Sequence, residues 1–401
     1  MLAERYTKEM TCFLEERREV LTKMSRTIWE NPELGHQEYT ASKLLTDMLE
    51  ENGFAVSRGI CGMDTAFQAV KKSGKEGPVI VFVAEYDALP KVGHACGHNL
   101  FCCSAVGAGI ALARLQQEIA ELGGEVRVIG SPAEEGTVPN YGTKVVLVEN
   151  GYFDDADCVF TAHGEGETVI ERSLVAATTI QIRFKGYAVH AGGDQVQGKN
   201  ALTAGMLCIN NMNAIRQQNL PCDVVNAIVT EGGLISNTIP DHCGLEFSVR
   251  SDTSRNLDRV LQNLENSAKA AALVTGCTYE TEVVKNPMRD TKSNHALGTV
   301  LAEYLDSIGE PYKEKDSRNF AWDVGDITYV CPTLGAYFKI GSSDIVCHTE
   351  PFCAAAGSET GFAGMMTAAK GMAAVALEYL MNPQLREAAW KEYEETRKPF
   401  R

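Results

Sequence analysis

The pattern of apolar and polar positions predicts helices at the start of the chain. Apolar side chains recur there at the three- and four-residue spacing of a helix that buries one face. They are Met10, Phe13, Leu14, Val20, Leu21 and Met24. Asn31-Pro32 breaks the pattern, because a proline inside a helix lacks its N–H donor and clashes with the preceding turn. A second helix is expected from about Thr40 and ends at Asn52-Gly53.

Short runs rich in β-branched residues follow and alternate with helical segments. Val79–Val83 and Val126–Gly130 are typical of strands buried in a sheet. An apolar helix is expected between them, from about Asn99 to Leu115. Buried strands that alternate with helices predict an α/β sandwich.

The pattern changes between about Ser173 and Val284, where strands and helices follow one another as one inserted α+β unit. Its expected elements are strands Thr178–Phe184, Leu245–Arg250 and Tyr279–Val284, and helices from Ala201 to about Gln217 and from Ser254 to about Ala272. After Pro287 the α/β pattern resumes. It predicts a helix near His295–Ile308, a strand at Thr333–Ile340 and a helix from about Ser358 to Met381.

These elements predict two domains, one of them discontinuous. Residues 1–175 and 286–401 are expected to form an α/β domain with a mixed sheet, and residues 176–285 the inserted α+β domain. A chain of 401 residues with 44% apolar residues is long enough for two cores.

Charge and cysteine content narrow the classes of partner and compartment. A net charge of -16 argues against binding nucleic acid or an anionic membrane and favours a small-molecule substrate. No apolar run is long enough to span a membrane, and the first residues lack the apolar core of a secretory signal, so a cytoplasmic protein is expected. The 13 cysteines follow no repeating frame and are expected to be reduced.

Two short segments carry most of the chemical information. Cys96 and His98 are two residues apart, so both can face one site only in a loop or extended segment. Glu134-Glu135 follows the strand at Val126–Gly130. Thiolate, imidazole and carboxylate are ligands of borderline divalent metals, and a second carboxylate supplies a base for a bound water. The combination predicts metal-assisted hydrolysis.

Three further residues stand where an expected strand ends. Asp87 follows Val79–Val83, His163 ends a short apolar strand, and His348 lies in a polar loop after Thr333–Ile340. Taken singly, Asp87 is typical of a turn, and each histidine is as consistent with a hydrogen-bonded structural role. Because ligands bind at the carboxyl ends of strands in open α/β sheets, the repeated position favours a shared site.

The order of these motifs resembles the M20 family of metallopeptidases and amidohydrolases over nearly the whole chain. The segments that match are Asp87-Ala88-Leu89-Pro90, Cys96-Gly97-His98, Pro132-Ala133-Glu134-Glu135, His163-Gly164, Ala188-Val189-His190-Ala191-Gly192-Gly193, Asn237-Thr238-Ile239-Pro240 and His348-Thr349-Glu350-Pro351-Phe352. The likeness is greatest to the aminoacylase-like branch with a cysteine ligand. Asn99 and Phe101 indicate the group that includes aminobenzoyl-glutamate hydrolase and M20-domain-containing dipeptidase 2 proteins.

The resemblance implies a centre of two divalent metal ions, zinc or manganese, with cobalt an alternative. The implied ligands are Cys96, His98, Glu135, His163 and His348, and Cys96 is a candidate bridge between the ions. Glu134 is implied as the base that activates water, and Asp87 as the group that orients the centre.

The inserted domain resembles the family's ferredoxin-like lid and dimerisation domain. Its His190 is implied to stabilise the oxyanion, in its own or in a partner subunit's site. Asn237 and Arg250 are implied to hold the substrate, since an arginine can bind a carboxylate through two hydrogen bonds. A homodimer through this domain, or a dimer of dimers, is expected.

The leading hypothesis is hydrolysis of an amide bond in an N-acyl amino acid, an aminobenzoyl-glutamate-like conjugate or a short dipeptide. Two alternatives stay open at this point. One is an exopeptidase that acts on longer peptides. The other is a binding or regulatory protein that keeps the fold without catalysis, although every candidate ligand position and the base position are filled.

Overall fold

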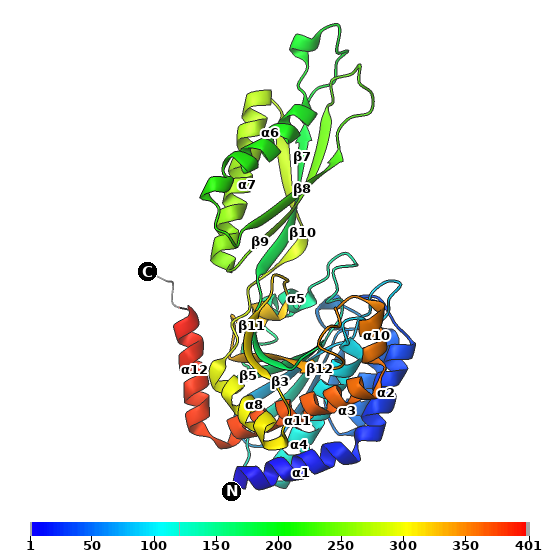
Figure 1. The fold of residues 1–401 in the computed structure, drawn as a ribbon, viewed down its shortest axis with the longest axis vertical. Helices are drawn as coiled ribbons and strands as arrows, with labels where there is room; N and C mark the ends of the chain where they lie inside the picture. Colours follow the sequence, from blue (N-terminus) through cyan, green and yellow to red (C-terminus); the bar gives the residue numbers. More distant parts are fainter. Residues whose placement is uncertain (1, 120, 398–401) are drawn as a thin grey trace. The chain divides into compact units, whose positions relative to one another are not determined.

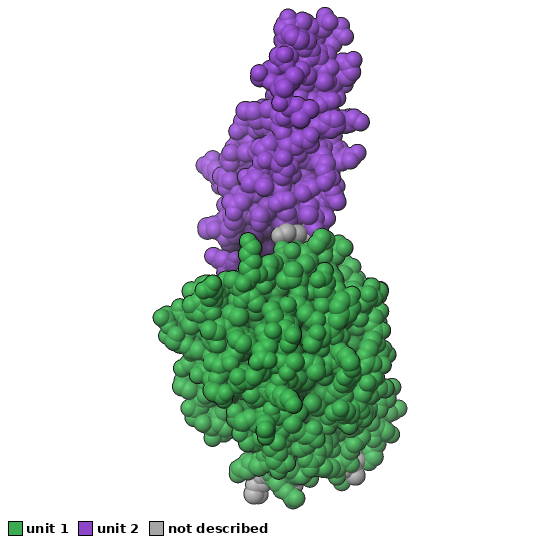
Figure 2. Space-filling model, turned by 90° about the vertical axis from the view of Figure 1, so that its right-hand side faces the viewer, with its two compact units in different colours: residues 1–173, 291–318, 323–401 green, residues 174–290, 319–322 purple. Residues whose placement is uncertain are grey.

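Two separate sheets, each with its own hydrophobic core, divide the chain into two units. The structure is a computed structural model that describes residues 2–119 and 121–397. Unit 1 comprises Met1–Ser173, Thr291–Arg318 and Asp323–Arg401, and unit 2 comprises Leu174–Asp290 and Asn319–Trp322 (Figure 2). Positions 398–401 of the domain expected at 286–401 lie outside the described residues. The return of Asn319–Trp322 to unit 2 has no counterpart in the sequence pattern.

Unit 1 contains an eight-stranded sheet in the order β1-β2-β4-β3-β5-β12-β6-β11. The strands are β1 (Ala55–Arg58), β2 (Phe67–Lys72), β3 (Val79–Glu85), β4 (Glu125–Ser131), β5 (Cys158–Glu165), β6 (Val169–Ser173), β11 (Lys313–Ser317) and β12 (Thr333–Lys339). The four central strands β4, β3, β5 and β12 run parallel, whereas β1, β2 and β6 each form antiparallel pairs. The sheet is therefore mixed.

Strand β3 shows why the centre of this sheet is a continuous apolar run. Ile80 and Phe82 belong to the core that contains α4, while Val81 and Val83 belong to a core on the other face that contains Leu147 of α5. Both faces of the strand are covered, so neither face needs polar side chains. This arrangement confirms the predicted α/β class with a mixed sheet.

Helices cover the sheet of unit 1 (Figure 1). They are α1 (Leu2–Glu16), α2 (Arg18–Glu30), α3 (Tyr39–Glu51), α4 (His98–Glu118), α5 (Thr143–Glu149), α8 (His295–Ile308), α9 (Val324–Ile327), α10 (Glu350–Ala356), α11 (Glu359–Met381) and α12 (Pro383–Arg397), with a 3-10 turn at Ile60–Gly62. The first helix expected from the sequence is in fact two helices, because the chain turns at Arg17, whose N–H donates to Leu14 O at 3.1 Å. Helical spacing alone does not show such a turn.

Helix α4 is the central helix of unit 1. It packs on β3, β4 and β5 and against α11 and α2. By length and composition it could cross a membrane, but 94% of its apolar window is buried inside the structure. This burial is typical of the core helix of a folded domain. The helix begins at His98, which places its first turn beside the residues described below.

Unit 2 has a four-stranded antiparallel sheet in the order β10-β7-β9-β8. Its elements are β7 (Ala176–Lys185), α6 (Ala201–Ala214), β8 (Val224–Glu231), β9 (His242–Ser251), α7 (Ser254–Thr275) and β10 (Thr278–Met288), with 3-10 turns at Gln195–Gln197 and Arg216–Gln218. Helices α6 and α7 lie side by side on the sheet (Figure 1). The order β-α-β-β-α-β with this pairing is the ferredoxin-like arrangement.

Strand β8 forms an open edge of the sheet in unit 2. It pairs with β9 on one side, and most of its side chains are exposed. Ile228 and Val229 are 59% and 49% exposed although both are apolar. An exposed edge strand with apolar side chains is a ready template for pairing with another chain.

Candidate metal centre

The predicted ligands of unit 1 converge at the carboxyl end of the parallel strands. Asp87 lies two residues beyond β3, Glu134 and Glu135 lie beyond β4, and His163 lies near the end of β5. Cys96 and His98 stand at the start of α4, and His348 follows β12. All of these residues belong to unit 1.

Left-handed backbone conformations turn the chain at three places in this cluster. Gly97 has φ of +79°, which glycine adopts without strain and which lets Cys96 and His98 face the same side. Ala133 has φ of +50° immediately before Glu134, and His348 has φ of +66°. Positive φ is uncommon for residues with a Cβ, and strain of this kind is concentrated at functional sites.

Cys96 is the common member of two groups of potential ligand atoms. Its Sγ lies 3.5 Å from Nε2 of His163 and 3.3 Å from Nε2 of His348. Cys96, His98 and His163 offer ligand atoms that all lie within 4.8 Å of one another, and so do Cys96, Cys347 and His348. A residue shared by two such groups can bridge two metal ions.

A third group joins the two adjacent glutamates to the same centre. His98, Glu134 and Glu135 offer ligand atoms within 4.8 Å of one another. Oε2 of Glu135 lies 3.4 Å from Nε2 of His348, and Oε2 of Glu134 lies 3.7 Å from Nε2 of His98. Both carboxylates predicted from the sequence therefore reach the centre.

Asp87 orients two of these groups. Its Oδ1 accepts a hydrogen bond from Nδ1 of His98 at 3.0 Å, and its Oδ2 accepts one from the backbone N–H of Glu135 at 2.8 Å. The other ring nitrogen of His98, Nε2, is buried and has no hydrogen-bond partner in the part of the chain that the structure describes. An imidazole held by a carboxylate on one nitrogen and left open on the other is the usual arrangement of a metal-binding histidine. The residues present thus fit a divalent metal ion.

Burial and charge shift the pKa values of these groups in ways that suit the same chemistry. Burial raises the pKa of Glu134 well above its usual range, and the nearby charges of Glu135 and Glu85 act in the same direction. Burial lowers the pKa of His163, which keeps the imidazole neutral as a metal ligand requires. A carboxyl group whose pKa is raised is suited to accept and release a proton near neutral pH.

Glu85, Lys144 and Asp323 lie behind the centre and were not predicted from the sequence. Nζ of Lys144 lies 2.7 Å from Oε1 of Glu85 and 2.5 Å from Oδ1 of Asp323, and all three side chains are buried. Oε2 of Glu85 lies 3.5 Å from Nε2 of His98. The two-residue period of a strand was a signal for Glu85, since it stands two positions before Asp87. The short apolar segment that contains Lys144 carried no such signal.

Cys347 stands directly before His348 in the sequence, but no role was predicted for it. Its Sγ lies 3.3 Å from Sγ of Cys96. The hydrogen bond between the two sulfurs raises the pKa of Cys96 well above its usual range and lowers that of Cys347 to about 4.

The remaining predicted residues, His190, Asn237 and Arg250, belong to unit 2. His190 forms an isolated bridge with Thr238, and the backbone N–H of Ala191 donates to Asn237 O at 2.8 Å, so His190 and Asn237 lie together in one loop region. Arg250 stands near the other end of β9 and donates to Asn319 O at 2.9 Å. The structure thus brings two of these three residues together.

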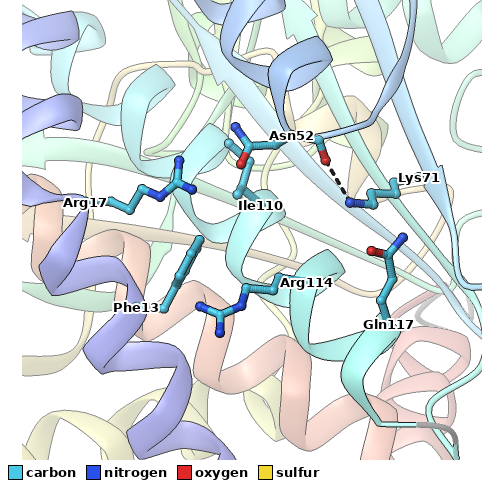
Figure 3. A pocket seen from close by; sticks show the side chains of 7 residues that line it. All are labelled: Phe13, Arg17, Asn52, Lys71, Ile110, Arg114 and Gln117. Carbon is cyan, nitrogen blue, oxygen red and sulfur yellow. Dashed lines mark hydrogen bonds between the residues drawn. The ribbon is translucent and has the colours of Figure 1, made fainter.

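A cavity elsewhere in unit 1 is distinct from this centre. It has a volume of about 320 Å³ and is lined by Phe13, Arg17, Asn52, Lys71, Ile110, Arg114 and Gln117 (Figure 3). Arg114 follows His98 along α4 by 16 residues, about 24 Å at the rise of a helix. None of its lining residues offers a thiolate, imidazole or carboxylate, so this cavity is not part of the metal centre.

Comparisons with known proteins agree with this arrangement. Residues 173–275 match the family described as the peptidase dimerisation domain. The chain is 33% identical over 393 residues to the Xaa-Arg dipeptidase of Mus musculus, a match that covers 95% of this chain and 90% of that protein. It is 29% identical over 327 residues to a component of the p-aminobenzoyl-glutamate hydrolase of Escherichia coli strain K12, covering 77% of this chain and 66% of that one.

Solved structures show the same fold at lower sequence identity. A dinuclear metal binding peptidase of the M20 family from Bacillus subtilis superposes with a TM-score of 0.70 at 20% identity. The match covers 92% of this chain and 99% of that chain. Both units of the present structure therefore have counterparts in one solved molecule.

Proposed function

The chain belongs to the M20 family of metal-dependent amide hydrolases, and from this premise we propose that it cleaves an N-acyl amino acid, an aminobenzoyl-glutamate-like conjugate or a short dipeptide. The observation that carries the proposal is the convergence of thiol, imidazoles and two glutamates at one end of the sheet. The names of its relatives, a dipeptidase and an aminobenzoyl-glutamate hydrolase, support the same substrate class.

Two divalent metal ions, zinc or manganese with cobalt an alternative, fit the donors present. Cys96, His98 and His163 would hold one ion, and Cys96, Glu135 and His348 the other. When bound, such ions lower the pKa of a water molecule and polarise the amide carbonyl. The chain's own groups then decide orientation and proton transfer.

Glu134 is the proposed general base. Its carboxylate reaches the centre beside His98, and from there it would accept the proton of the attacking water and return it to the leaving amine. Asp87 keeps the His98 ring and the Glu135 backbone in place while this occurs. Glu135 binds metal, so the adjacent glutamates have separate roles.

Unit 2 supplies the remaining groups, and we propose that it does so between two copies of the chain. Its match to a dimerisation domain indicates an oligomer. His242 to Arg250 spans about 27 Å of extended strand, and His190 lies beyond the His242 end. One small substrate cannot contact His190 and Arg250 of the same chain. If Arg250 binds the substrate carboxylate in the site of its own chain, His190 and Asn237 of that site therefore come from a partner copy.

The exposed edge of β8 supports a homodimer through unit 2. Its free edge and its apolar side chains, including Ile228 and Val229, suit strand pairing between two copies. A dimer of dimers is a further arrangement of the same unit.

All 13 cysteines are free, which supports a reducing, cytoplasmic compartment.

The test combines a substrate panel with the base variant. Metal-loaded protein should hydrolyse acyl amino acids or dipeptides and lose activity on exhaustive chelation. Glu134→Gln should bind metal as wild type does and lose at least about 100-fold in kcat. Activity that survives chelation would contradict the proposal. Hydrolysis of long peptides at equal rates would favour the exopeptidase, and no hydrolysis by loaded wild type would favour a binding protein.

A further inference from the structure

Cys347 lies inside the metal centre although no motif used above assigns it a role. Its Sγ is 3.3 Å from Sγ of Cys96, and with Cys96 and His348 it forms one of the groups of ligand atoms within 4.8 Å. Both cysteines are unbridged. A disulfide needs a sulfur–sulfur distance of about 2.05 Å, so these two atoms are in contact without a bond.

The backbone brings adjacent side chains to the same side at this point. Successive residues of an extended chain point to opposite faces. His348 instead has φ of +66°, and its N–H donates to Ala95 O at 2.9 Å. The thiol of Cys347 donates to the same carbonyl at 3.4 Å. The strained conformation thus turns Cys347 and His348 together toward Cys96.

The spacing of these atoms is close to, and slightly shorter than, the edges of a tetrahedral site. With zinc bonds of about 2.3 Å to sulfur and about 2.0 to 2.1 Å to nitrogen, a tetrahedron places two sulfurs about 3.8 Å apart and sulfur and nitrogen about 3.5 Å apart. The distances here are 3.3 Å between the sulfurs and 3.3 Å between Cys96 Sγ and His348 Nε2. Shifts of less than about 0.5 Å would complete the geometry.

We propose that Cys347 is a further metal ligand and that it makes the position beside His348 selective for a thiophilic ion such as zinc over manganese. Two thiolates favour zinc, because manganese prefers oxygen ligands. Glu135, His348 and Cys96 would be present at this position in any case, so Cys347 is the residue that sets its preference. The inference rests on the metal centre proposed above.

Cobalt reports thiolate ligation directly, because cobalt bound to thiolate absorbs in the near ultraviolet. Wild type, Cys347→Ser and Cys353→Ser would be loaded with cobalt under reducing, oxygen-free conditions and the absorbance per bound ion compared. Cys353 is a matched control, since it is half-buried in α10 and outside every ligand group. Cys347→Ser should lose between about a third and a half of the thiolate absorbance, according to whether Cys96 binds one ion or both. Cys353→Ser should lose none.

Metal competition supplies the second measurement. In equimolar zinc and manganese, the ratio of bound manganese to bound zinc at one of the two positions should be about tenfold or more higher in Cys347→Ser than in wild type. Cys347→Asp, which replaces the thiolate with an oxygen ligand, should shift at least as far and still hold two ions. Absorbance and selectivity that match wild type in both variants, with the fold verified by circular dichroism, would overturn the inference. A wild type that takes up no cobalt would instead refute the metal centre itself.

Discussion

Asp87 and His98 share a hydrogen bond of 3.0 Å between Oδ1 and Nδ1 in which neither side chain is more than 1% exposed. The same carboxylate also accepts from the backbone N–H of Glu135 through its other oxygen. Burial alone would raise the pKa of Asp87. The hydrogen bond and the charge of His98 outweigh burial, so the pKa of Asp87 is lowered. One carboxylate therefore fixes a ring from α4 and a backbone from the loop after β4.

Asp87→Asn should weaken metal binding. An amide has one oxygen and one NH2 group, so it cannot offer an acceptor at both positions, the one at Oδ1 that faces His98 and the one at Oδ2 that faces the N–H of Glu135. Loss of a group that orients a ligand typically costs about 10- to 100-fold in metal affinity. Competition with a chelating dye measures the affinity. Asp64→Asn, at an exposed position, is the control, and an Asp87→Asn affinity equal to that of the control would refute the orienting role.

Glu38 should make stability depend on pH near neutrality. Its buried carboxylate accepts from Thr65 at 2.7 Å and from the N–H of Ala133 at 2.8 Å. Burial, with the charge of Asp87, raises its pKa from 4.5 to about 7. The folded protein then binds more protons than the unfolded chain, so stability falls as pH rises from 4.5 to about 7.

The shift corresponds to roughly 3 kcal/mol across that window. Glu38→Gln should flatten this slope in urea unfolding of the metal-free protein. Glu30→Gln, at an exposed position, should leave the slope as in wild type. An unchanged slope in Glu38→Gln would assign the pH dependence to other groups.

The buried cation between Glu85 and Asp323 should stabilise the folded protein strongly. Lys144→Met leaves both carboxylates buried without this amine, and breaking a buried pair typically costs about 3 to 5 kcal/mol. Lys43→Met is the matched control, because Lys43 is 73% exposed in its pair with Asp47 and such pairs contribute at most about 1 kcal/mol. Denaturant unfolding monitored by fluorescence measures both. A cost for Lys144→Met no larger than for Lys43→Met would contradict the prediction.

Mixing inactive variants should test whether the site is shared between subunits. In a dimer of His190→Ala with Arg250→Ala, one site has both wild-type residues and the other has neither. Random reassociation should then restore about one quarter of wild-type activity. His190→Ala mixed with Asn237→Ala should restore none, because both residues lie in the same loop region of unit 2. Equal activity in the two mixtures, with exchange verified by affinity tags, would place all three residues in one subunit's site.

Elements with local signals could be predicted from the sequence. Helix α8 spans His295–Ile308 as expected, with the side chain of Asn294 at its start and Gly309 in a left-handed conformation at its end. Strand β8 was not predicted, because an edge strand with mostly exposed side chains has no alternation of buried and exposed positions. Tertiary pairing rather than local pattern makes it a strand.

The residues of the site likewise divide into those that could be predicted from the sequence and those that could not. Asp87, Cys96 and Glu135 could be predicted because parallel strands bring their ends together whatever the details of packing. Lys144 could not, since a lysine in an apolar helix becomes a buried cation only through the placement of Glu85 and Asp323. Cys347 needed the conformation of His348, which depends on a hydrogen bond to Ala95 across the chain.

The position of β12 has a consequence for synthesis of the chain. This strand lies between β5 and β6 in the sheet of unit 1, yet it follows the whole of Leu174–Asp290 in sequence. During synthesis on the ribosome, the edge of β5 that later pairs with β12 is therefore unpaired. The strands of unit 2 pair only with strands from its own segment, so unit 2 can fold before β12 is made. An unpaired edge of buried apolar residues invites aggregation during that interval. The insertion thus delays closure of the sheet, and His348 completes the centre last.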